Sequence, residues 1–211
     1  VTSISISQDT AALLQAGKEI SAWTGGCYDM TVSPIVKAWG FTEEEHRVPT
    51  QEELDTLLPL VDSGGVILSE TEQTAYLTKA GMAVDTSDAV TKLLRDSGVT
   101  SALIYLGGNI STLGTKPDGT LWKIAVENPL DATDYVGLME VSDCSVITSG
   151  GYQRYFEQDG KRYHHIIDPS NGYPAESGLL SVTIISENGT KADGLSTALF
   201  VMGLEDAMEF W

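Results

Sequence analysis

Apolar residues recur at helical spacing close to the start of the chain. Within residues 8–23, positions such as Leu13 and Ile20 fall near a period of about 3.6 residues, which indicates an amphipathic helix. Ser7 or Asp9 is its candidate N-cap. The paired glycines of "TGGCYDMTVSP" then interrupt the pattern, so we expect the helix to end before them.

Three further segments are predicted to be helical. They are residues 51–61, residues 87–97, and "TKADGLSTALFVMG", which ends at Gly203. Short apolar or alternating runs predict strands, and "YQRYFEQDGKRYHHIID" predicts a hairpin that turns at Asp159-Gly160. The strand candidates are residues 65–69, 74–78, 101–110 (running into a Gly-Gly turn), 121–129, 137–143, 145–150 and 179–186. Helices mixed with antiparallel strands, without regular βα alternation, predict an α+β fold.

Composition narrows the classes of function. Of 211 residues, 12 are Lys or Arg and 30 are Asp or Glu, for a formal net charge of −18. Such a surface repels a phosphate backbone, so we expect no nucleic-acid partner, although it can gather divalent cations. No apolar run approaches the roughly 20 residues of a membrane span. Cys27 and Cys144 have no metal-ligand spacing.

A carboxylate and a hydroxyl are spaced to share one helix face in "KADGLSTALFVMG". Asp193 and Thr197 lie four residues apart, and we expect Asp193 in the first turn, where the helix dipole favours anions. Both are hard oxygen ligands suited to Mg²⁺. The alternative is a helix-terminal charge beside a surface threonine.

Two adjacent histidines precede an Asp-Pro and an Asn-Gly turn in "RYHHIIDPSNGYP". Strand alternation puts His164 and His165 on opposite faces, so one of them at most enters a given pocket. A neutral histidine can accept a proton from a hydroxyl nucleophile. The alternative is one solvated histidine and one hydrogen-bonded within the sheet.

Paired glycines end the strands of "YLGGNI" and "TSGGY", and aromatic residues follow those of "GGCYDMTVSPIVKAWGF". Such turns allow a planar or phosphorylated ligand to approach the backbone, and aromatic rings can stack on it. Each signal is weak alone. No dinucleotide or Walker fingerprint is present in the sequence.

Together and in this order, "TGGCYDMTVSPIVKAWGF", "YLGGNI", "VITSGGYQRYFEQDGKRYHHIIDPSNGYP" and "KADGLSTALFVMG" resemble the ApbE family of Mg²⁺-dependent FAD:protein FMN transferases. The likeness runs from about residue 10 to 208. It implies one T-fold-like α+β domain over residues 1–211, with mixed or antiparallel sheets and flanking helices. The chain begins and ends within patterned segments, so we expect the domain to continue past both ends.

The resemblance also assigns roles to residues of the candidate site. It implies that His165 is the catalytic residue near the reacting phosphate, and that Asp193, Thr197 and Ser196 bind the metal. The residues that it implies for the flavin nucleotide are Cys27, Tyr28, Asp29, Asp85, Ser149, Gly150 and Ile167.

One departure from the family pattern follows Asp85. The family continues there with a glycine-rich loop that contacts the metal and carries a lysine, whereas this chain passes directly to Thr86-Ser87-Asp88. We expect the loop to be omitted from this sequence, because a strand and a helix flank the junction intact. The alternative is a degenerate, inactive homologue.

The activity that the resemblance implies is cleavage of FAD at its pyrophosphate, with release of AMP. FMN passes to a threonine of a target protein, as in subunits of membrane redox complexes. The alternatives are an FAD pyrophosphatase that yields FMN and AMP, and an inactive FAD-binding carrier. Family members are usually exported, so a membrane-anchored lipoprotein outside the cytoplasm is the expected location.

Overall fold

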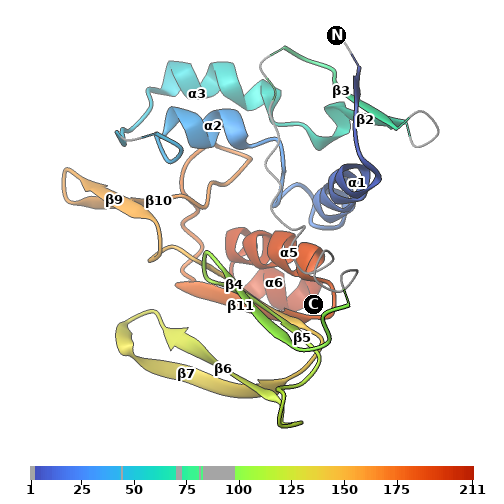
Figure 1. The fold of residues 1–211 in the computed structure, drawn as a ribbon. Coiled ribbons are helices and arrows are strands. Elements are labelled where there is room, and N and C mark those ends of the chain that lie inside the picture. Colours follow the sequence, from blue (N-terminus) through green and yellow to red (C-terminus); the bar gives the residue numbers. More distant parts are fainter. Residues whose placement is uncertain (1–2, 44, 70–72, 81, 83–97) are drawn as a thin grey trace.

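The computed structural model describes residues 3–43, 45–69, 73–80, 82 and 98–211. Helices α1 to α3 and one small sheet lie at one end, and a larger sheet covered by α5 lies at the other (Figure 1). The predicted helix at 87–97 and the junction after Asp85 fall outside the described residues. No helix within the described ranges is long and apolar enough to cross a bilayer.

The small sheet is antiparallel, with strand order β1-β3-β2. Helix α1 packs beside it and is capped by Ser7, whose hydroxyl accepts the Thr10 amide. Two short helices, α2 and α3, form the corner beyond, and a 3₁₀ turn extends α3 (Figure 1). The bounds are β1 Ile4–Ser5, α1 Gln8–Trp23, α2 Ser33–Ala38, α3 Gln51–Leu57, 3₁₀ turns Leu58–Leu60 and Ser63–Gly65, β2 Val66–Ser69 and β3 Thr74–Leu77.

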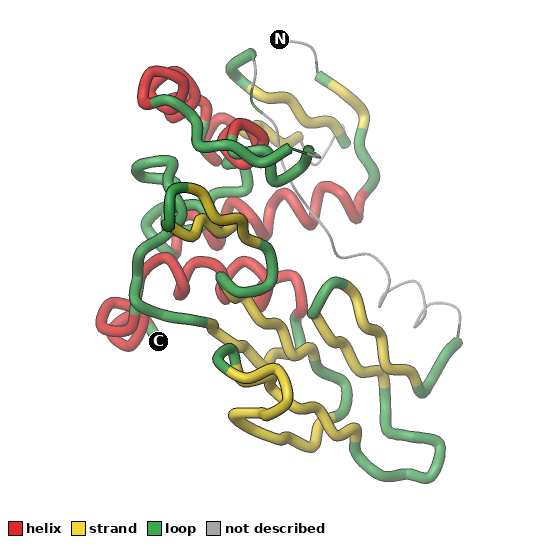
Figure 2. Tube along the Cα trace, turned by 90° about the vertical axis from the view of Figure 1, so that its left-hand side faces the viewer, coloured by secondary structure: helices red, strands yellow, loops and turns green. Residues whose placement is uncertain are grey.

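The larger sheet has four antiparallel strands in the order β11-β8-β5-β4, and α5 packs against β8 and β11. Figure 2 shows the same two halves from the side, with helices between the sheets. There are also two separate two-stranded hairpins: β6–β7 lies beside the larger sheet (Figure 1), and β9–β10 packs against the α2 corner. The bounds are β4 Ala102–Leu106, β5 Asn109–Leu113, β6 Trp122–Asn128, β7 Asp131–Val141, β8 Ser145–Gly150, β9 Tyr155–Gln158, β10 Lys161–His164, β11 Ser181–Ser186, α5 Gly189–Met202 and α6 Leu204–Phe210.

Trp39 anchors the core at the α2 corner. Its ring is fully buried, and its Nε1 donates to the Gly172 carbonyl at 2.8 Å. Phe156, Tyr163 and Tyr173 surround it with ring centroids 5.2 to 6.3 Å away. Aromatic packing therefore ties α2 to hairpin β9–β10 and to the turn that follows it.

The α+β prediction is confirmed, as are helix 8–23 and the hairpin that turns at Asp159-Gly160. The helix predicted over 51–61 is α-helical only to Leu57, since Pro59 has no amide hydrogen to continue it. The chain after the glycines of the 101–110 segment is a separate strand, β5. Neither α2 nor α6 was expected from the pattern.

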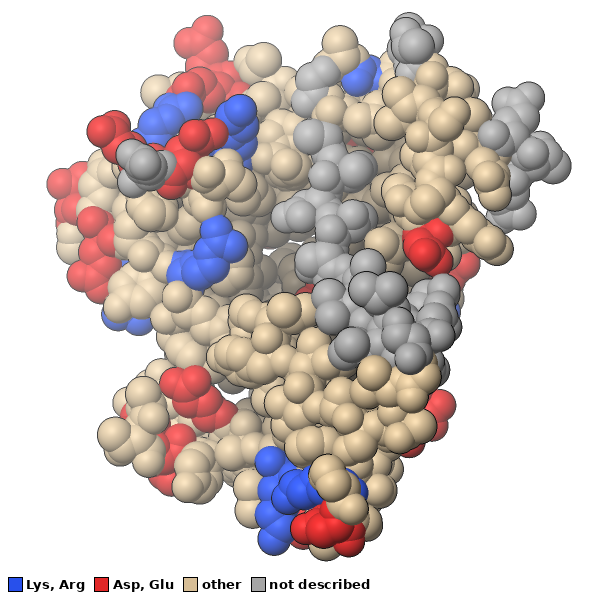
Figure 3. Space-filling view, in the orientation of Figure 1, with Lys and Arg blue, Asp and Glu red and all other residues tan. Residues whose placement is uncertain are grey.

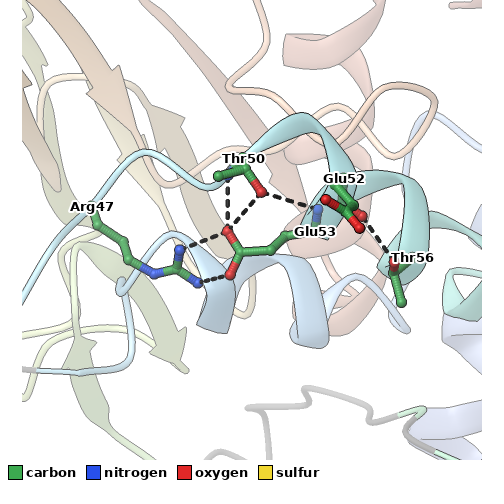
Figure 4. Close-up of polar contacts among 5 residues, drawn as sticks. All are labelled: Arg47, Thr50, Glu52, Glu53 and Thr56. Atoms are coloured by element: carbon green, nitrogen blue, oxygen red, sulfur yellow. Dashed lines mark hydrogen bonds and ion pairs between the residues drawn. The ribbon is translucent and has the colours of Figure 1, made fainter.

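Helix α3 begins with a capping box (Figure 4). The Thr50 hydroxyl accepts the Glu53 amide at 3.2 Å, and the Glu53 carboxylate accepts the Thr50 amide at 2.9 Å. Arg47 donates to both oxygens of Glu53 at 2.8 Å, and these hydrogen bonds lower the pKa of Glu53 to about 2. The helix start is thereby fixed by local polar contacts.

Replacing Thr50 with Ala should lower the free energy of unfolding by about 1 kcal/mol, because the Glu53 amide loses its acceptor. Urea denaturation checks this value. Thr56→Ala is the control, since that hydroxyl only donates to the Glu52 carbonyl within the helix. Its effect should stay within about 0.5 kcal/mol. Equal losses in the two variants would contradict the cap assignment.

Candidate functional site

A cavity of about 230 Å³ lies where α1, the segment after it, α5 and the approach to hairpin β9–β10 meet. It brings together residues from distant parts of the sequence, several of them predicted site residues. It is lined by Leu13, Gly17, Ile20, Tyr28, Asp29, Met30, Val32, Val36, Thr42, Arg154, His165, Thr190 and Asp193. Apolar walls with a few polar groups are typical of a ligand pocket.

Asp193 lines this cavity from α5. Its Oδ1 accepts a hydrogen bond at 3.0 Å from the side-chain amide of Asn109, the first residue of β5. The prediction that Asp193 lies in the first helical turn is wrong, because Asn188 caps the helix and places Asp193 in the second turn. The carboxylate thus lies beyond the first helical turn and is bonded to a side chain of the neighbouring sheet.

A chain of hydroxyl groups runs from β8 into α5. Ser149 Oγ lies 2.8 Å from Ser196 Oγ and 3.1 Å from Thr197 Oγ1. Ser196 donates its one hydrogen to the Asp193 carbonyl at 2.9 Å, so Ser149 must donate to Ser196 and Thr197 to Ser149. Among the described residues, this order gives the lone pairs of Thr197 Oγ1 no donor, although Thr197 is not part of the described cavity lining. Ser196 is fully buried.

His165 lines the same cavity and is held by the backbone of Arg154. Its amide and its ring Nδ1 both lie 3.1 Å from the Arg154 carbonyl. A carbonyl only accepts, so Nδ1 carries the hydrogen and Nε2 of the neutral ring is a proton acceptor. Burial lowers the pKa of His165 to about 4, and the charges of Arg154 and His164 add to the shift.

His164 points to a different environment, as strand alternation predicts. Its ring packs edge-on against Phe200 at 5.5 Å, and its Nε2 lies 3.1 Å from the Ala175 carbonyl. Burial lowers the pKa of this histidine as well. His164 is not among the cavity residues, so His165 is the histidine that the cavity contains.

Asp29 lines the cavity, but its carboxylate is buried and already bonded. Oδ1 accepts from the Thr31 amide at 2.8 Å and from the Thr31 hydroxyl at 2.5 Å, and Oδ2 accepts from the Ser63 amide at 2.9 Å. Neighbouring Tyr28 also lines the cavity. These hydrogen bonds thus fix Asp29 as part of the cavity wall.

The other described residues that were predicted to bind the flavin nucleotide are not part of the cavity lining: Cys27, Ser149, Gly150 and Ile167. Ile167 is buried in the cluster around Trp39. Burial, with the charges of Asp168 and Asp206, raises the pKa of the Cys27 thiol. A Cβ on Gly150 would lie 2.5 Å from the Tyr152 ring, so this glycine permits close packing. Their contacts with FAD stay predictions, as does that of Asp85, which lies outside the described residues.

Sequence reasoning missed Arg154 and Asn109 as site residues. Arg154 stands in "YQRYF" and Asn109 follows the Gly107-Gly108 turn, whose φ angles are +58° and +98°. The signal available for Arg154 was its charge: it is an arginine in a strongly acidic chain, within the predicted hairpin segment with two histidines. No local signal marks Asn109, since its partner Asp193 lies 84 residues away in sequence.

The donors near Asp193 fit a magnesium site that is completed by the substrate. The described part of the chain holds no group of three or more His, Cys, Asp or Glu side chains that could bind a metal. Asp193 and Thr197 nevertheless offer a carboxylate and a hydroxyl, both hard oxygen ligands. Mg²⁺ is commonly held by one or two carboxylates together with substrate phosphates and water. Asp193 and Thr197 are therefore suitable ligands for Mg²⁺ only if a phosphorylated ligand supplies further oxygens to the ion.

Comparison with known proteins places this chain in a family. The model of the ApbE family matches residues 2–211, and the chain belongs to that family. It is 37% identical to the FAD:protein FMN transferase of Klebsiella pneumoniae (strain 342), over 96% of this chain and 65% of that protein. Identity to the Vibrio cholerae FAD:protein FMN transferase (strain O395) is 36%, over 96% of this chain and 64% of the relative. The chain thus spans less than two thirds of these curated relatives.

Solved structures give the same result for the fold. The ApbE protein from Thermotoga maritima matches with a TM-score of 0.83 and 32% identity, over 99% of this chain and 70% of that one. The flavin transferase ApbE from Vibrio cholerae matches with a TM-score of 0.84 and 32% identity, over 99% and 69%. The family match and the structural matches confirm the resemblance to the ApbE family that the four sequence motifs indicated.

The geometry at His165 gives a test by NMR. The ring should titrate with a pKa of about 4, well below the usual 6.5, because protonation would place a buried charge beside Arg154. Its ¹⁵N shifts near neutral pH should show a protonated Nδ1 and an unprotonated Nε2. A resonance that vanishes in His165→Gln identifies the residue. Titration near 6.5 or the opposite tautomer would contradict the assignment.

Proposed function

We propose that this chain carries the FMN-transfer activity for which its relatives are named: it splits FAD at the pyrophosphate, releases AMP and attaches FMN to a protein hydroxyl. One observation carries the proposal. A single cavity in an ApbE-family chain contains a neutral histidine with Nε2 as proton acceptor, the Asp193 carboxylate, and a cationic side chain. These are the groups that phosphoryl transfer to a hydroxyl requires.

His165 would act as the general base. The incoming hydroxyl oxygen attacks the phosphorus of the FMN phosphate, and its proton passes to Nε2 of His165. The bond from that phosphorus to the bridging oxygen breaks, and AMP leaves with the bridging oxygen. Because its Nδ1 stays bonded to the Arg154 carbonyl, the ring is held in the tautomer that the step needs.

The charged side chains of the cavity lining support the proposal that the pyrophosphate binds together with a divalent cation. Among the described residues, the lining carries two carboxylates, Asp29 and Asp193, against one cation, Arg154, while His165 is neutral. A pyrophosphate adds about two negative charges to this set, and the whole chain carries −18. Bound Mg²⁺ would neutralise the pyrophosphate oxygens. Asp193 and Thr197 would hold it, with Asn109 fixing the orientation of Asp193.

The acceptor that we propose is a threonine hydroxyl of a target protein. Such a hydroxyl has no charge to be repelled by an acidic surface. It needs a base to remove its proton during attack, and His165 supplies one. Water could reach the same phosphorus, so product analysis must separate transfer from hydrolysis.

Purified protein incubated with FAD, Mg²⁺ and a threonine-containing peptide should release AMP and yield a peptide heavier by one FMN. Chromatography of the nucleotides and mass spectrometry of the peptide measure the two products. Addition of EDTA should stop both. Free FMN without labelled peptide would indicate a pyrophosphatase, and the absence of AMP as well as FMN would contradict any FAD-cleaving function.

Asp193→Asn should reduce FAD turnover by at least about a hundredfold, because the metal loses its charged protein ligand. Rates measured over a range of Mg²⁺ concentrations test this, and excess Mg²⁺ should restore part of the activity. Asp55→Asn is the control, since Asp55 is an exposed carboxylate of α3 that does not line the cavity. Equal activity of the two variants would exclude Asp193 from the metal site.

A further inference from the structure

Arg154 differs from the other arginines that the structure describes. Arg47 pairs with Glu53 at 2.8 Å, and Arg162 pairs with Glu157 at 3.3 Å. Among the described residues, Arg154 pairs with no carboxylate, although the chain has 30 acidic residues to 12 basic ones. It is also the only Lys or Arg among the described residues that line the cavity. A guanidinium that pairs with none of the described carboxylates, in so acidic a chain, is suited to bind an external anion.

Arg154 is fixed at both its backbone and its side chain. Its carbonyl accepts the amide and the Nδ1 hydrogen of His165 at 3.1 Å each. Its Nη2 donates to the Phe41 carbonyl at 2.6 Å. Among the described residues, this is the one side-chain hydrogen bond of Arg154, so four of its five guanidinium hydrogens are left for a ligand by that part of the chain. The cation is thereby held beside His165 in advance, so little conformational entropy is lost when an anion binds.

We propose that the guanidinium of Arg154 binds the phosphoryl group that is transferred, next to the base His165. This inference rests on the proposed function and specifies its anion site. Arginine matches the paired oxygens of a phosphoryl group with two parallel N–H donors. Negative charge builds up on those oxygens during transfer, so the contact strengthens in the transition state and raises the rate as well as the affinity.

The test compares Arg154→Gln, Arg154→Lys and the control Arg162→Gln in the full chain. Arg162 lies in hairpin β9–β10, stacks on Tyr155 at 4.1 Å and already pairs with Glu157. Fluorescence titration measures the affinities for FAD and for riboflavin, which has no phosphate. Arg154→Gln should weaken FAD binding at least about tenfold, with riboflavin affinity unchanged. Arg162→Gln should match the wild type for both ligands.

Transfer kinetics give a second measurement. Arg154→Lys keeps a charge and a donor but loses the planar fork, so kcat should fall more than the FAD affinity does. Unchanged FAD affinity and unchanged kcat in Arg154→Lys and Arg154→Gln would overturn the proposal. So would an equal loss of FAD and riboflavin binding, since that result indicates a change of cavity shape. If Arg154→Gln fails to fold, the same two measurements on the lysine variant decide between these outcomes.

The outcomes separate this proposal from the broader function. A wild-type chain that binds FAD but forms no AMP would contradict the proposed function, while the ratio of FAD to riboflavin affinity would still report on Arg154. A wild-type chain that cleaves FAD and retains this activity in Arg154→Gln would leave the function standing and overturn the arginine site. A wild-type chain that binds no FAD would overturn both.

Discussion

One wall of the cavity depends on the hydrogen bonds that satisfy a buried carboxylate, that of Asp29. Asp29 would be costly to bury without hydrogen bonds, and it obtains them from Thr31 in its own turn and from the amide of Ser63. The Thr31 hydroxyl in turn accepts the Asp62 amide at 2.7 Å. These bonds join the turn after α1 to the 3₁₀ turn before β2. The chain at Tyr28 is consequently fixed as a wall of the cavity.

Two glycines within helices allow neighbouring parts of the cavity wall to pack closely against one another. A Cβ on Gly17 of α1 would lie 2.6 Å from the Met30 sulfur, and a Cβ on Gly194 of α5 would lie 2.6 Å from Ile20 Cδ1. Glycine inside a helix costs about 1 kcal/mol relative to alanine. Here the absent side chains allow α1 to pack closely on Met30 and on α5, and residues of α1, α5 and the turn that Asp29 holds all line the cavity.

Sequence patterns predicted the elements that are stabilised mainly by residues close to one another in the sequence. Helix α1 has a cap and a periodic apolar face, and the Asp159-Gly160 turn determines its hairpin, so both could be read from the sequence. Helix α2 has only six residues and is held by the burial of Trp39 against distant rings, which no local pattern reveals. All of His165, Asp193, Asn109 and Arg154 stand within the four motifs, but the family pattern assigned roles only to the first two. Asn109 and Arg154 make hydrogen bonds to residues distant in sequence, and these contacts appear only after folding.

The distribution of charge links the acidity of the chain to the chemistry of the cavity. On the face drawn in Figure 3, many of the charged side chains gather over the α2–α3 end, where acidic and basic groups mix. Arg154, by contrast, is the only Lys or Arg among the described residues that line the cavity. Burial is the main cause that lowers the pKa of His165 and keeps its ring neutral, and the positive charge of Arg154 adds to this effect. The same charge attracts an anion to that ring. In the function that we propose, this one cation would favour a neutral base and also bind the phosphoryl group, in a protein whose overall charge of −18 opposes the binding of an anion.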